Sequence, residues 1–228
     1  MAYQTLRLIL LFYNMRTTVR FPDFRNFIHI LDDVFIKKIY EVEFAQNPKL
    51  IVDCGANIGI ASLYFKLKYP KVRLVCFEPS SLAFSYLTKN LSKFGRDCQL
   101  YNQALVGDKR TRAKLAGNHA HPYAHLAKGE KIGEYEEVNC TRLSDKLPKK
   151  TKIDLLKVDI EGMETEVISE LAKSRRLENV RQAIIEVHRQ MLNSKQIANL
   201  ISLLAKNDFE IVFKGGNVHT FMIHAFRS

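Results

Sequence analysis

The sequence of 228 residues has no closely spaced cysteine pair, no internal repeat and no long apolar run. Its four cysteines lie far apart, at Cys54, Cys76, Cys98 and Cys140. This wide spacing argues against a zinc site and against a disulfide framework. We therefore expect the cysteines to be small buried residues of a protein in a reducing compartment.

The apolar stretch near the N-terminus, residues 6–13, is interrupted by Arg7 and is too short to span a bilayer. No small-residue cleavage site follows it, so a signal peptide is not expected. We expect a helix that packs against its own domain, and hence a cytoplasmic protein. The alternative is an amphipathic helix in a membrane interface, which would give the protein a peripheral membrane contact.

The sequence has 228 residues, and 46% of them are hydrophobic. This length and composition suffice for one domain with a substantial core. The formal net charge of +11 favours anionic partners such as nucleic acid, a phosphorylated or nucleotide-linked sugar, or an acidic membrane face. The alternative is a solvated basic surface without a partner. The short basic runs lack the interleaved aromatic residues of a single-strand platform, so charge alone does not predict a nucleic-acid enzyme.

From residue 50 onward, short apolar runs alternate with stretches of helical periodicity. This alternation predicts an α/β, Rossmann-like fold, in which helices cover both faces of a parallel sheet. A glycine-containing turn at residues 215–217 predicts a terminal hairpin. We therefore expect a mostly parallel, seven-stranded sheet with an antiparallel C-terminal edge strand. The expected strands are residues 50–54, 72–77, 99–102, 153–159, 183–187, 209–213 and 218–225.

Two segments lie outside this alternation. Residues 1–48 precede the main domain, residues 49–228, as a lead-in that we expect to be helical or irregular and able to close over a cleft as a lid. An insert at about residues 105–142 is expected to contain a loop and short antiparallel strand. It carries three histidines, His119, His121 and His125, which could bind metal, line an acceptor pocket or simply be polar loop residues.

The first chemical motif is the loop DCGANIG, residues 53–59, between a predicted strand and a predicted helix. Gly55 permits a tight turn and Gly59 a close approach to the backbone. The N-terminus of the next helix suits a carboxylate, such as that of a methionine-derived cofactor. Glu78 ends the following strand, where an acid can accept hydrogen bonds from both ribose hydroxyls. The glycine spacing differs from GxGxxG, which counts against a dehydrogenase.

A further motif, DLLKVDIEGME, occupies residues 154–164 and contains the pattern KxDxEGxE. Together with the DxGANxG loop and the FEP triplet at residues 77–79, it resembles the FkbM-type methyltransferases over about residues 48–190. The resemblance implies a class I methyltransferase fold and S-adenosylmethionine as the cofactor. It most often implies O-methylation, with sugar hydroxyls and polyketide macrolides among the family's acceptors.

The resemblance also implies positions for individual residues. Asp159 lies at the mouth of the fourth strand beside the cofactor, and Asn102 lies near the adenine. Glu78 binds the ribose. The residues placed around the methionine half are Asp53, Gly55, Ala56, Asn57 and Gly59.

Transfer to a hydroxyl oxygen gains from a general base. The candidates at the carboxyl edge of the sheet are His188, Glu161 and Asp159. His188 has the intrinsic pKa nearest to neutrality, whereas Glu161 could instead fix the loop through backbone N–H groups. Lys157 could pair with Asp159 or contact the acceptor. Asp159, Glu186 and His188 could alternatively hold a divalent cation.

The leading hypothesis is an S-adenosylmethionine-dependent O-methyltransferase for a hydroxyl of a sugar, glycan or natural product. The basic charge favours an anionic acceptor such as a nucleotide-linked or phosphorylated sugar. One alternative is an RNA or protein methyltransferase. Another is a non-catalytic nucleotide-binding module, because a fold does not fix a function. The glycine loop, Glu78 and the carboxylates at the sheet edge favour an enzyme.

Overall fold

The computed structural model describes residues 4–10, 15–117, 125–127, 134–215 and 218–227. Its centre is a seven-stranded sheet in the order β12-β13-β11-β10-β3-β4-β5. The strands are β3 (Leu50–Cys54), β4 (Arg73–Phe77), β5 (Cys98–Tyr101), β10 (Ile153–Val158), β11 (Val180–His188), β12 (Glu210–Lys214) and β13 (Thr220–Phe226). This arrangement confirms the predicted α/β fold.

The antiparallel strand of this sheet is β13, the last strand in the chain. It pairs antiparallel with both β11 and β12, whereas β3, β4, β5, β10 and β11 pair in parallel. Because β13 lies between β11 and β12, the edge strand at this end of the sheet is β12, and β5 forms the opposite edge.

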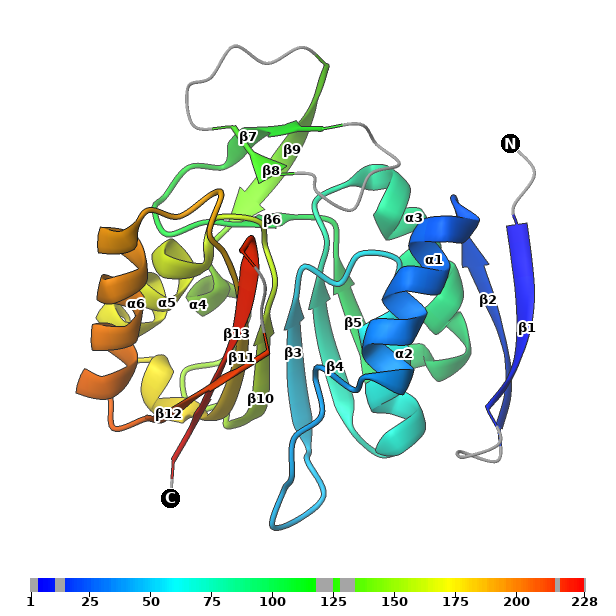
Figure 1. The fold of residues 1–228 in the computed structure, drawn as a ribbon, viewed down its shortest axis with the longest axis horizontal. Helices are drawn as coiled ribbons and strands as arrows, with labels where there is room; N and C mark the ends of the chain where they lie inside the picture. Colours follow the sequence, from blue (N-terminus) through cyan, green and yellow to red (C-terminus); the bar gives the residue numbers. More distant parts are fainter. Residues whose placement is uncertain (1–3, 11–14, 118–124, 128–133, 216–217, 228) are drawn as a thin grey trace.

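Helices cover both faces of the sheet (Figure 1). They are α1 (Phe24–Leu31), α2 (Ile60–Lys68), α3 (Ser81–Leu91), α4 (Leu143–Lys146), α5 (Glu164–Lys173) and α6 (Ser194–Lys206). Apolar residues of α1, α2 and α3 form one core with one face of the strands, and those of α4, α5 and α6 form the other. Shorter turns are a π-helical one at Asp32–Ile36 and 3₁₀ ones at Ser92–Asp97 and Leu177–Asn179.

Local signals account for several of these boundaries. Every residue of β3 is buried, as expected for a continuous apolar run in a parallel sheet. Ser80, the N-cap of α3, accepts a hydrogen bond from the backbone N–H of Ala83. Asn193 and Gln196 form a reciprocal capping box at the start of α6.

The prediction of a helix at residues 6–13 is wrong. Residues 4–10 form β1 (Gln4–Leu10), which pairs antiparallel with β2 (Met15–Phe21); residues 11–14 lie outside the described part of the chain. The physical reason is visible at residues 18–21, where exposed and buried side chains alternate with the period of two of a strand. Stretches that are both apolar and strand-periodic are easily assigned to helices when their partner strand is not recognised.

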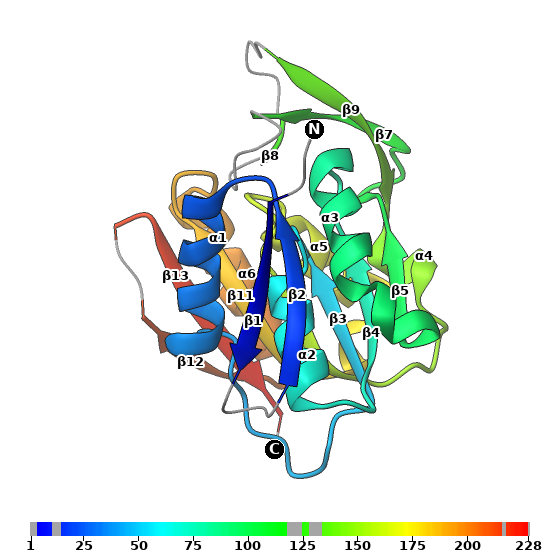
Figure 2. The ribbon, with the colours of Figure 1, turned by 90° about the vertical axis from the view of Figure 1, so that its right-hand side faces the viewer.

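Strand β2 of the hairpin lies beside α3 (Figure 2). Polar and apolar contacts fix the hairpin to the main domain. Asn90 of α3 accepts from the backbone N–H of Arg20 at 2.8 Å and donates to its carbonyl at 2.9 Å. Phe21 stacks on Phe27 of α1 with ring centroids 4.3 Å apart. The lead-in therefore continues directly into the core that packs one face of the sheet.

The insert forms a second, four-stranded sheet in the order β6-β9-β7-β8, at the top in Figure 1. Its strands are β6 (Ala104–Leu105), β7 (Arg112–Ala116), β8 (His125–Leu126) and β9 (Tyr135–Thr141). The predicted antiparallel strand is present, because β7 pairs antiparallel with β8 and β9. His125 lies in β8, whereas His119 and His121 fall outside the described residues.

Two further expectations concern the cysteines and the membrane. Cys54, Cys76 and Cys140 are buried, Cys98 is half-buried, and all are free thiols. Within the described ranges, no helix combines the length and the apolar character needed to cross a bilayer.

Substitution of Gly55 should test how closely β3 and β10 must approach. Gly55 has φ +79°, and a Cβ there would lie 1.7 Å from the carbonyl oxygen of Asp159. Gly95 has φ +53° but open space around its position, so Gly95→Ala measures the backbone cost alone, about 1–3 kcal/mol. We expect Gly55→Ala to reduce the free energy of unfolding clearly more than this in urea denaturation. Equal losses would contradict the requirement for close approach.

Candidate active site

A cavity of about 920 Å³ lies at the carboxyl ends of β3, β4, β10 and β11. Its walls include the loop after β3, the end of β4 and the loop after β10. The lead-in contributes α1 and Tyr40, and the insert contributes Leu115 and Leu126. Ligands of open α/β sheets bind at this edge, so the cavity is the candidate active site.

The glycine loop forms one wall of the cavity through Gly55, Ala56, Asn57 and Ile58. The backbone N–H groups of Gly55 and Ala56 both donate to the Phe77 carbonyl, at 3.0 and 2.9 Å. These bonds join the loop to the end of β4. Gly59, with φ +89°, is the N-cap of α2. Ile60 and Ala61, at the start of α2, also line the cavity. The first N–H groups of a helix have no acceptor inside it.

A buried ion pair lies behind this loop. Lys157 of β10, 2% exposed, places Nζ 3.0 Å from Oδ1 of the fully buried Asp53 and donates to the Gly55 carbonyl at 2.9 Å. Ser62 donates to Oδ2 of Asp53 at 2.6 Å. Burial lowers the pKa of Lys157, but the charges of Asp53 and Asp159 outweigh it and keep the ammonium charged. Asp53 therefore supports the loop from behind and does not line the cavity.

Glu78 stands where the loop and the end of β4 meet. One carboxylate oxygen accepts from the N–H of Asn57 and the other from the N–H of Ser80, both at 2.8 Å. Burial raises the pKa of Glu78 to about 7, although these hydrogen bonds and the charge of Lys157 oppose the shift. Each oxygen retains a lone pair for a ligand hydroxyl.

Asn102 acts on the backbone around Glu78. Its side-chain amide donates to the carbonyls of Glu78 and Pro79, each at 2.9 Å. The adjacent cavity wall is formed by Gln103, Ala104 and Leu105, which sequence analysis did not single out.

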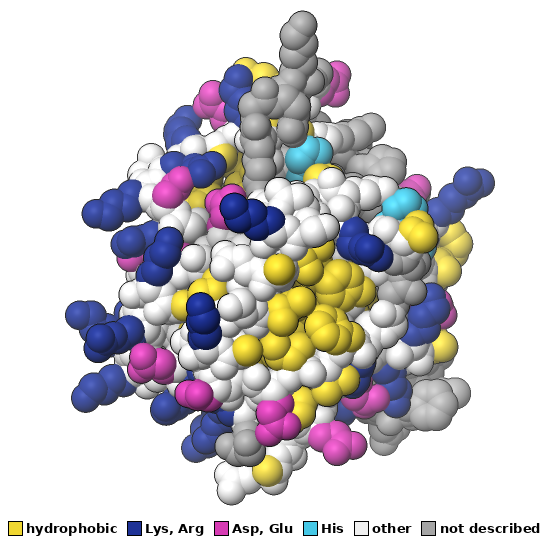
Figure 3. Space-filling view, turned by 60° about the vertical axis from the view of Figure 1, so that its left-hand side comes forward, with side chains coloured by type: hydrophobic (Ala, Val, Ile, Leu, Met, Phe, Trp, Pro, Cys, Tyr) yellow, Lys and Arg dark blue, Asp and Glu magenta, His cyan; other side chains and the backbone are white. Residues whose placement is uncertain are grey.

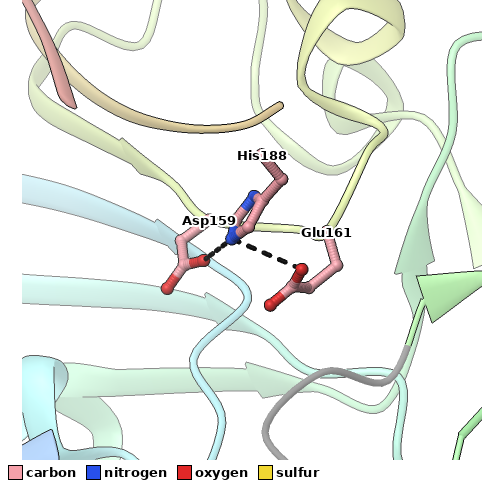
Figure 4. Close-up of side chains that lie close together, drawn as sticks. All are labelled: Asp159, Glu161 and His188. Carbon is pink, nitrogen blue, oxygen red and sulfur yellow. Dashed lines mark ion pairs between the residues drawn. The ribbon is translucent and has the colours of Figure 1, made fainter. Parts of the chain in front are cut away.

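The acidic end of the cavity is lined by Asp159, Glu161 and His188 (Figure 4). Together with the buried Glu164 behind the imidazole, we call these residues the His188 cluster. His188 Nδ1 lies 2.8 Å from Oε1 of the fully buried Glu164. Its Nε2 lies 3.3 Å from Oε2 of Glu161 and 3.7 Å from Oδ1 of Asp159. The structure therefore brings together the three residues predicted to be catalytic.

The backbone after β10 directs Glu161 toward this cluster. Glu161 has φ +49° and Gly162 has φ +97°, both in the left-handed region. A residue with a Cβ adopts that conformation at a cost of about 1–3 kcal/mol, and such strain is common at functional sites. Oε1 of Glu164 also accepts from the N–H of Gly162 at 3.1 Å, so Glu164 fixes both this turn and the imidazole of His188.

Burial and neighbouring charges perturb the pKa values in this cluster. Burial lowers the pKa of His188, but the hydrogen bond to Glu164 and the nearby carboxylates raise it to about 9. Burial also raises the pKa of Glu161 to about 8, which His188 only partly opposes. For Asp159, burial acts upward, yet the charges of Lys157 and His188 leave its pKa below the ordinary value. At neutral pH, His188 therefore holds a proton and Asp159 is ionised.

Tyr40 is a site residue that sequence analysis missed. Its hydroxyl lies 3.0 Å from Oδ2 of Asp159 and 3.2 Å from Oε2 of Glu186, and can donate to either. Lys157 lies over its ring, 5.0 Å from the centroid. Burial, together with the charge of Asp159, raises the pKa of Glu186 to about 7. Tyr40 comes from an irregular stretch between Ile36 and β3, where neither a motif nor a periodicity marks it.

Comparison with solved structures identifies the class of fold. The chain superposes on the fibrillarin/Nop5p complex with a TM-score of 0.53 and 15% identity, over 86% of this chain and 79% of that one. A ribosomal protein L11 methylase from Lactobacillus delbrueckii subsp. bulgaricus gives 0.50 and 14%, over 88% and 80%. Together with the strand order, these similarities show a class I methyltransferase fold.

Sequence comparison then identifies the family. A model of the FkbM methyltransferase domain matches residues 53–211, and the protein therefore belongs to this family of methyltransferases. Methyltransferase 1 of Beauveria bassiana is 32% identical over 168 residues, which are 63% of this chain and 66% of that protein. Methyltransferase sdnD of Sordaria araneosa is 31% identical over 198 residues, 69% and 73%. The chain thus spans just under two thirds of the Beauveria relative.

A more distant relative carries the family name. It is the 31-O-demethyl-FK506 methyltransferase FkbM of Streptomyces tacrolimicus, 25% identical over 208 residues, which are 75% of this chain and 78% of that protein. The predicted resemblance to FkbM-type methyltransferases is confirmed.

A double-mutant cycle should measure the ion pair behind the loop. Lys157→Met leaves the Asp53 carboxylate buried without its cation, and we expect it to lower the free energy of unfolding by about 3–5 kcal/mol. Adding Asp53→Asn to that variant should recover part of the loss, because the uncompensated charge is removed. Urea denaturation of the wild type, both single variants and the double variant gives the coupling. Additive losses would contradict a direct Asp53–Lys157 interaction.

Proposed function

We propose that the protein transfers a methyl group from S-adenosylmethionine to a hydroxyl oxygen of a sugar, glycan or natural product. The observation that carries this proposal is that the glycine loop and Glu78 line the same cavity as Asp159, Glu161 and His188. Membership in the FkbM family supports the reaction class.

The residues at the loop end suit the cofactor. The cavity volume lies within the range of about 300–1,000 Å³ that is typical of ligand pockets. The N-terminus of α2 offers N–H groups to the amino-acid carboxylate. Glu78 presents two oxygens to the ribose hydroxyls. Asp53 and Asn102 take supporting roles in this proposal: Asp53 fixes the loop through Lys157, and Asn102 fixes the backbone around Glu78.

The residues at the acidic end suit an acceptor hydroxyl. S-adenosylmethionine supplies a methyl group that is already activated. The acceptor oxygen forms a bond to the methyl carbon while the carbon–sulfur bond breaks, and the hydroxyl proton leaves to the protein. Since His188 carries a proton at neutral pH, we propose that Asp159, Glu161 and His188 act as one proton-sharing unit, not as a lone imidazole base.

The choice of acceptor follows from two observations. The Streptomyces tacrolimicus relative is named for a hydroxyl position of a natural product, which supports an oxygen acceptor here. Figure 3 shows Lys and Arg side chains spread over the visible face around an apolar patch, without a continuous basic groove on that face. We therefore favour a small or glycan acceptor over RNA, and an anionic sugar remains suited to the net charge of +11.

The role of Glu78 predicts how cofactor affinity depends on pH. Its pKa of about 7 means that protonation below pH 7 removes charge and an acceptor site from the ribose contact. We expect calorimetry to show S-adenosylhomocysteine binding about tenfold more weakly at pH 6 than at pH 8, because roughly a tenth of the carboxylate is ionised one unit below its pKa. Glu78→Gln should bind more weakly throughout and without this slope. A pH-independent wild type, or the same slope in the variant, would contradict the assignment.

A transfer assay tests the whole proposal. With radiolabelled methyl donor, sugar and natural-product hydroxyls should accept label, and RNA should not. His188→Gln should lower turnover about 100-fold, in the range typical of lost proton transfer, while S-adenosylhomocysteine affinity stays within threefold. His224→Gln is the matched control, because His224 is a buried histidine of β13 that does not line the cavity. If RNA alone accepts label, or if His188→Gln keeps full turnover, the proposal is wrong.

A further inference from the structure

The ends of β10 and β11 bring an imidazole nitrogen and two carboxylates to one point in the cavity wall. One ligand atom from each of Asp159, Glu161 and His188 can be chosen so that all three lie within 4.8 Å of one another. His188 Nε2 is 3.3 Å from Glu161 and 3.7 Å from Asp159. A cation with bonds of about 2.1 Å to such atoms sets them about 3.0–3.4 Å apart. The imidazole nitrogen is already close to this spacing, whereas the two carboxylates, which lie within 4.8 Å of each other, would have to be drawn together by the cation.

The imidazole is oriented for coordination. Nδ1 faces Glu164, which is fully buried and also holds the Gly162 N–H, so the ring cannot turn without losing that contact. When Nδ1–H donates to Glu164, Nε2 faces the carboxylates of Asp159 and Glu161, and a cation bound there would replace the proton of Nε2. A carboxylate that holds the far nitrogen of a histidine is the usual support of a metal-bound imidazole.

The placement of charge also favours a cation. Lys157 is committed to Asp53 and Gly55, and lies 3.4 Å from Asp159. On the cavity side, Nε2 of His188 has the carboxylates of Asp159, Glu161 and Glu186 within 4 Å. The other oxygen of Asp159 accepts from the neutral hydroxyl of Tyr40. Oxygen and imidazole ligands of this kind suit hard or borderline dications such as Mg²⁺ and Mn²⁺.

We propose that Asp159, Glu161 and His188 bind a divalent metal cation, with Glu164 as the positioning residue for His188. The inference rests on the proposed function. The cation would lie between Asp159, Glu161 and His188, in place of the proton that these residues share in that proposal. It would bind the acceptor oxygen and weaken the O–H bond. The hydroxyl proton would pass to the carboxylate of Glu186 on the same wall, while the oxygen–methyl bond forms and the carbon–sulfur bond breaks.

The ligand set differs from the sequence-based alternative of Asp159, Glu186 and His188. Oε1 of Glu186 lies 3.9 Å from Nε2, and its other carboxylate oxygen is within reach of the Tyr40 hydroxyl. Glu161 lies closer to Nε2. The structure therefore favours Glu161 over Glu186 as the third metal ligand. Glu186, a glutamate that lines the same cavity, serves as the matched control.

The test uses Mn²⁺ and the chelator-treated protein of 228 residues, with the electron paramagnetic resonance signal of free Mn²⁺ as the readout. We expect one equivalent to bind with a Kd below about 1 mM, the weak end of protein sites for hard dications. Glu161→Gln and His188→Gln should each weaken binding at least tenfold. Glu164→Gln should weaken it about 10–100-fold, as typical for an orienting carboxylate. Glu186→Gln should stay within threefold of the wild type.

Calorimetry with S-adenosylhomocysteine on the same samples separates the two proposals. Retained cofactor binding in the Glu161 and His188 variants shows that they are folded, so a loss of Mn²⁺ is then specific. Saturable Mn²⁺ binding without cofactor binding would overturn the proposed function alone. Cofactor binding without Mn²⁺ binding in the wild type would overturn this inference alone. Equal losses in Glu161→Gln and Glu186→Gln would overturn the ligand set.

Discussion

The buried ion pair between Asp53 and Lys157 is the constraint on which the rest of the site depends. It joins two parallel strands, β3 and β10, at the height where both become loops. An ammonium group in a core is stable only when its charge and its N–H groups are matched. Lys157 meets that condition with Asp53 and with the carbonyl of Gly55, so the charge balance of the core also fixes the start of the glycine loop.

The same lysine links the two ends of the cavity. Asp159 follows Lys157 by two residues and keeps a contact of 3.4 Å with its ammonium group. One charged side chain therefore supports both the glycine loop and the first acid of the His188 cluster. A change in the Asp53–Lys157 pair would alter the pKa of Asp159. Burial raises that pKa, and the charge of Lys157 is the largest of the effects that lower it below the ordinary value. Charge coupling, and not only chain connectivity, relates the two halves of the site.

The sequence predicts those parts of the site that lie on regular elements. Glycines after β3 and an acid after β4 are recognisable because the strand periodicity sets where each strand ends, and parallel strands place those ends at one edge. Tyr40 lies on no such element, and its role depends on a contact with Asp159 across 119 positions of the chain. Glu164 appears in the motif, but only the turn at Glu161 and Gly162 places it under His188. The hairpin was missed because its strands pair only with each other.

The elements that sequence patterns describe least well also form the outer walls of the cavity. Lead-in residues from α1 to Tyr40 lie on one side, and Leu115 and Leu126 of the insert lie on another. The family match begins at residue 53 and therefore leaves the lead-in outside it. The loop end of the cavity is built from the glycine loop and Glu78, which the family motifs include, whereas the lead-in adds the hydroxyl of Tyr40 to the acidic end. Under the proposed function, contact with the acceptor therefore falls to these outer walls and to the acidic end, apart from the glycine loop, Glu78 and the Asp53–Lys157 pair.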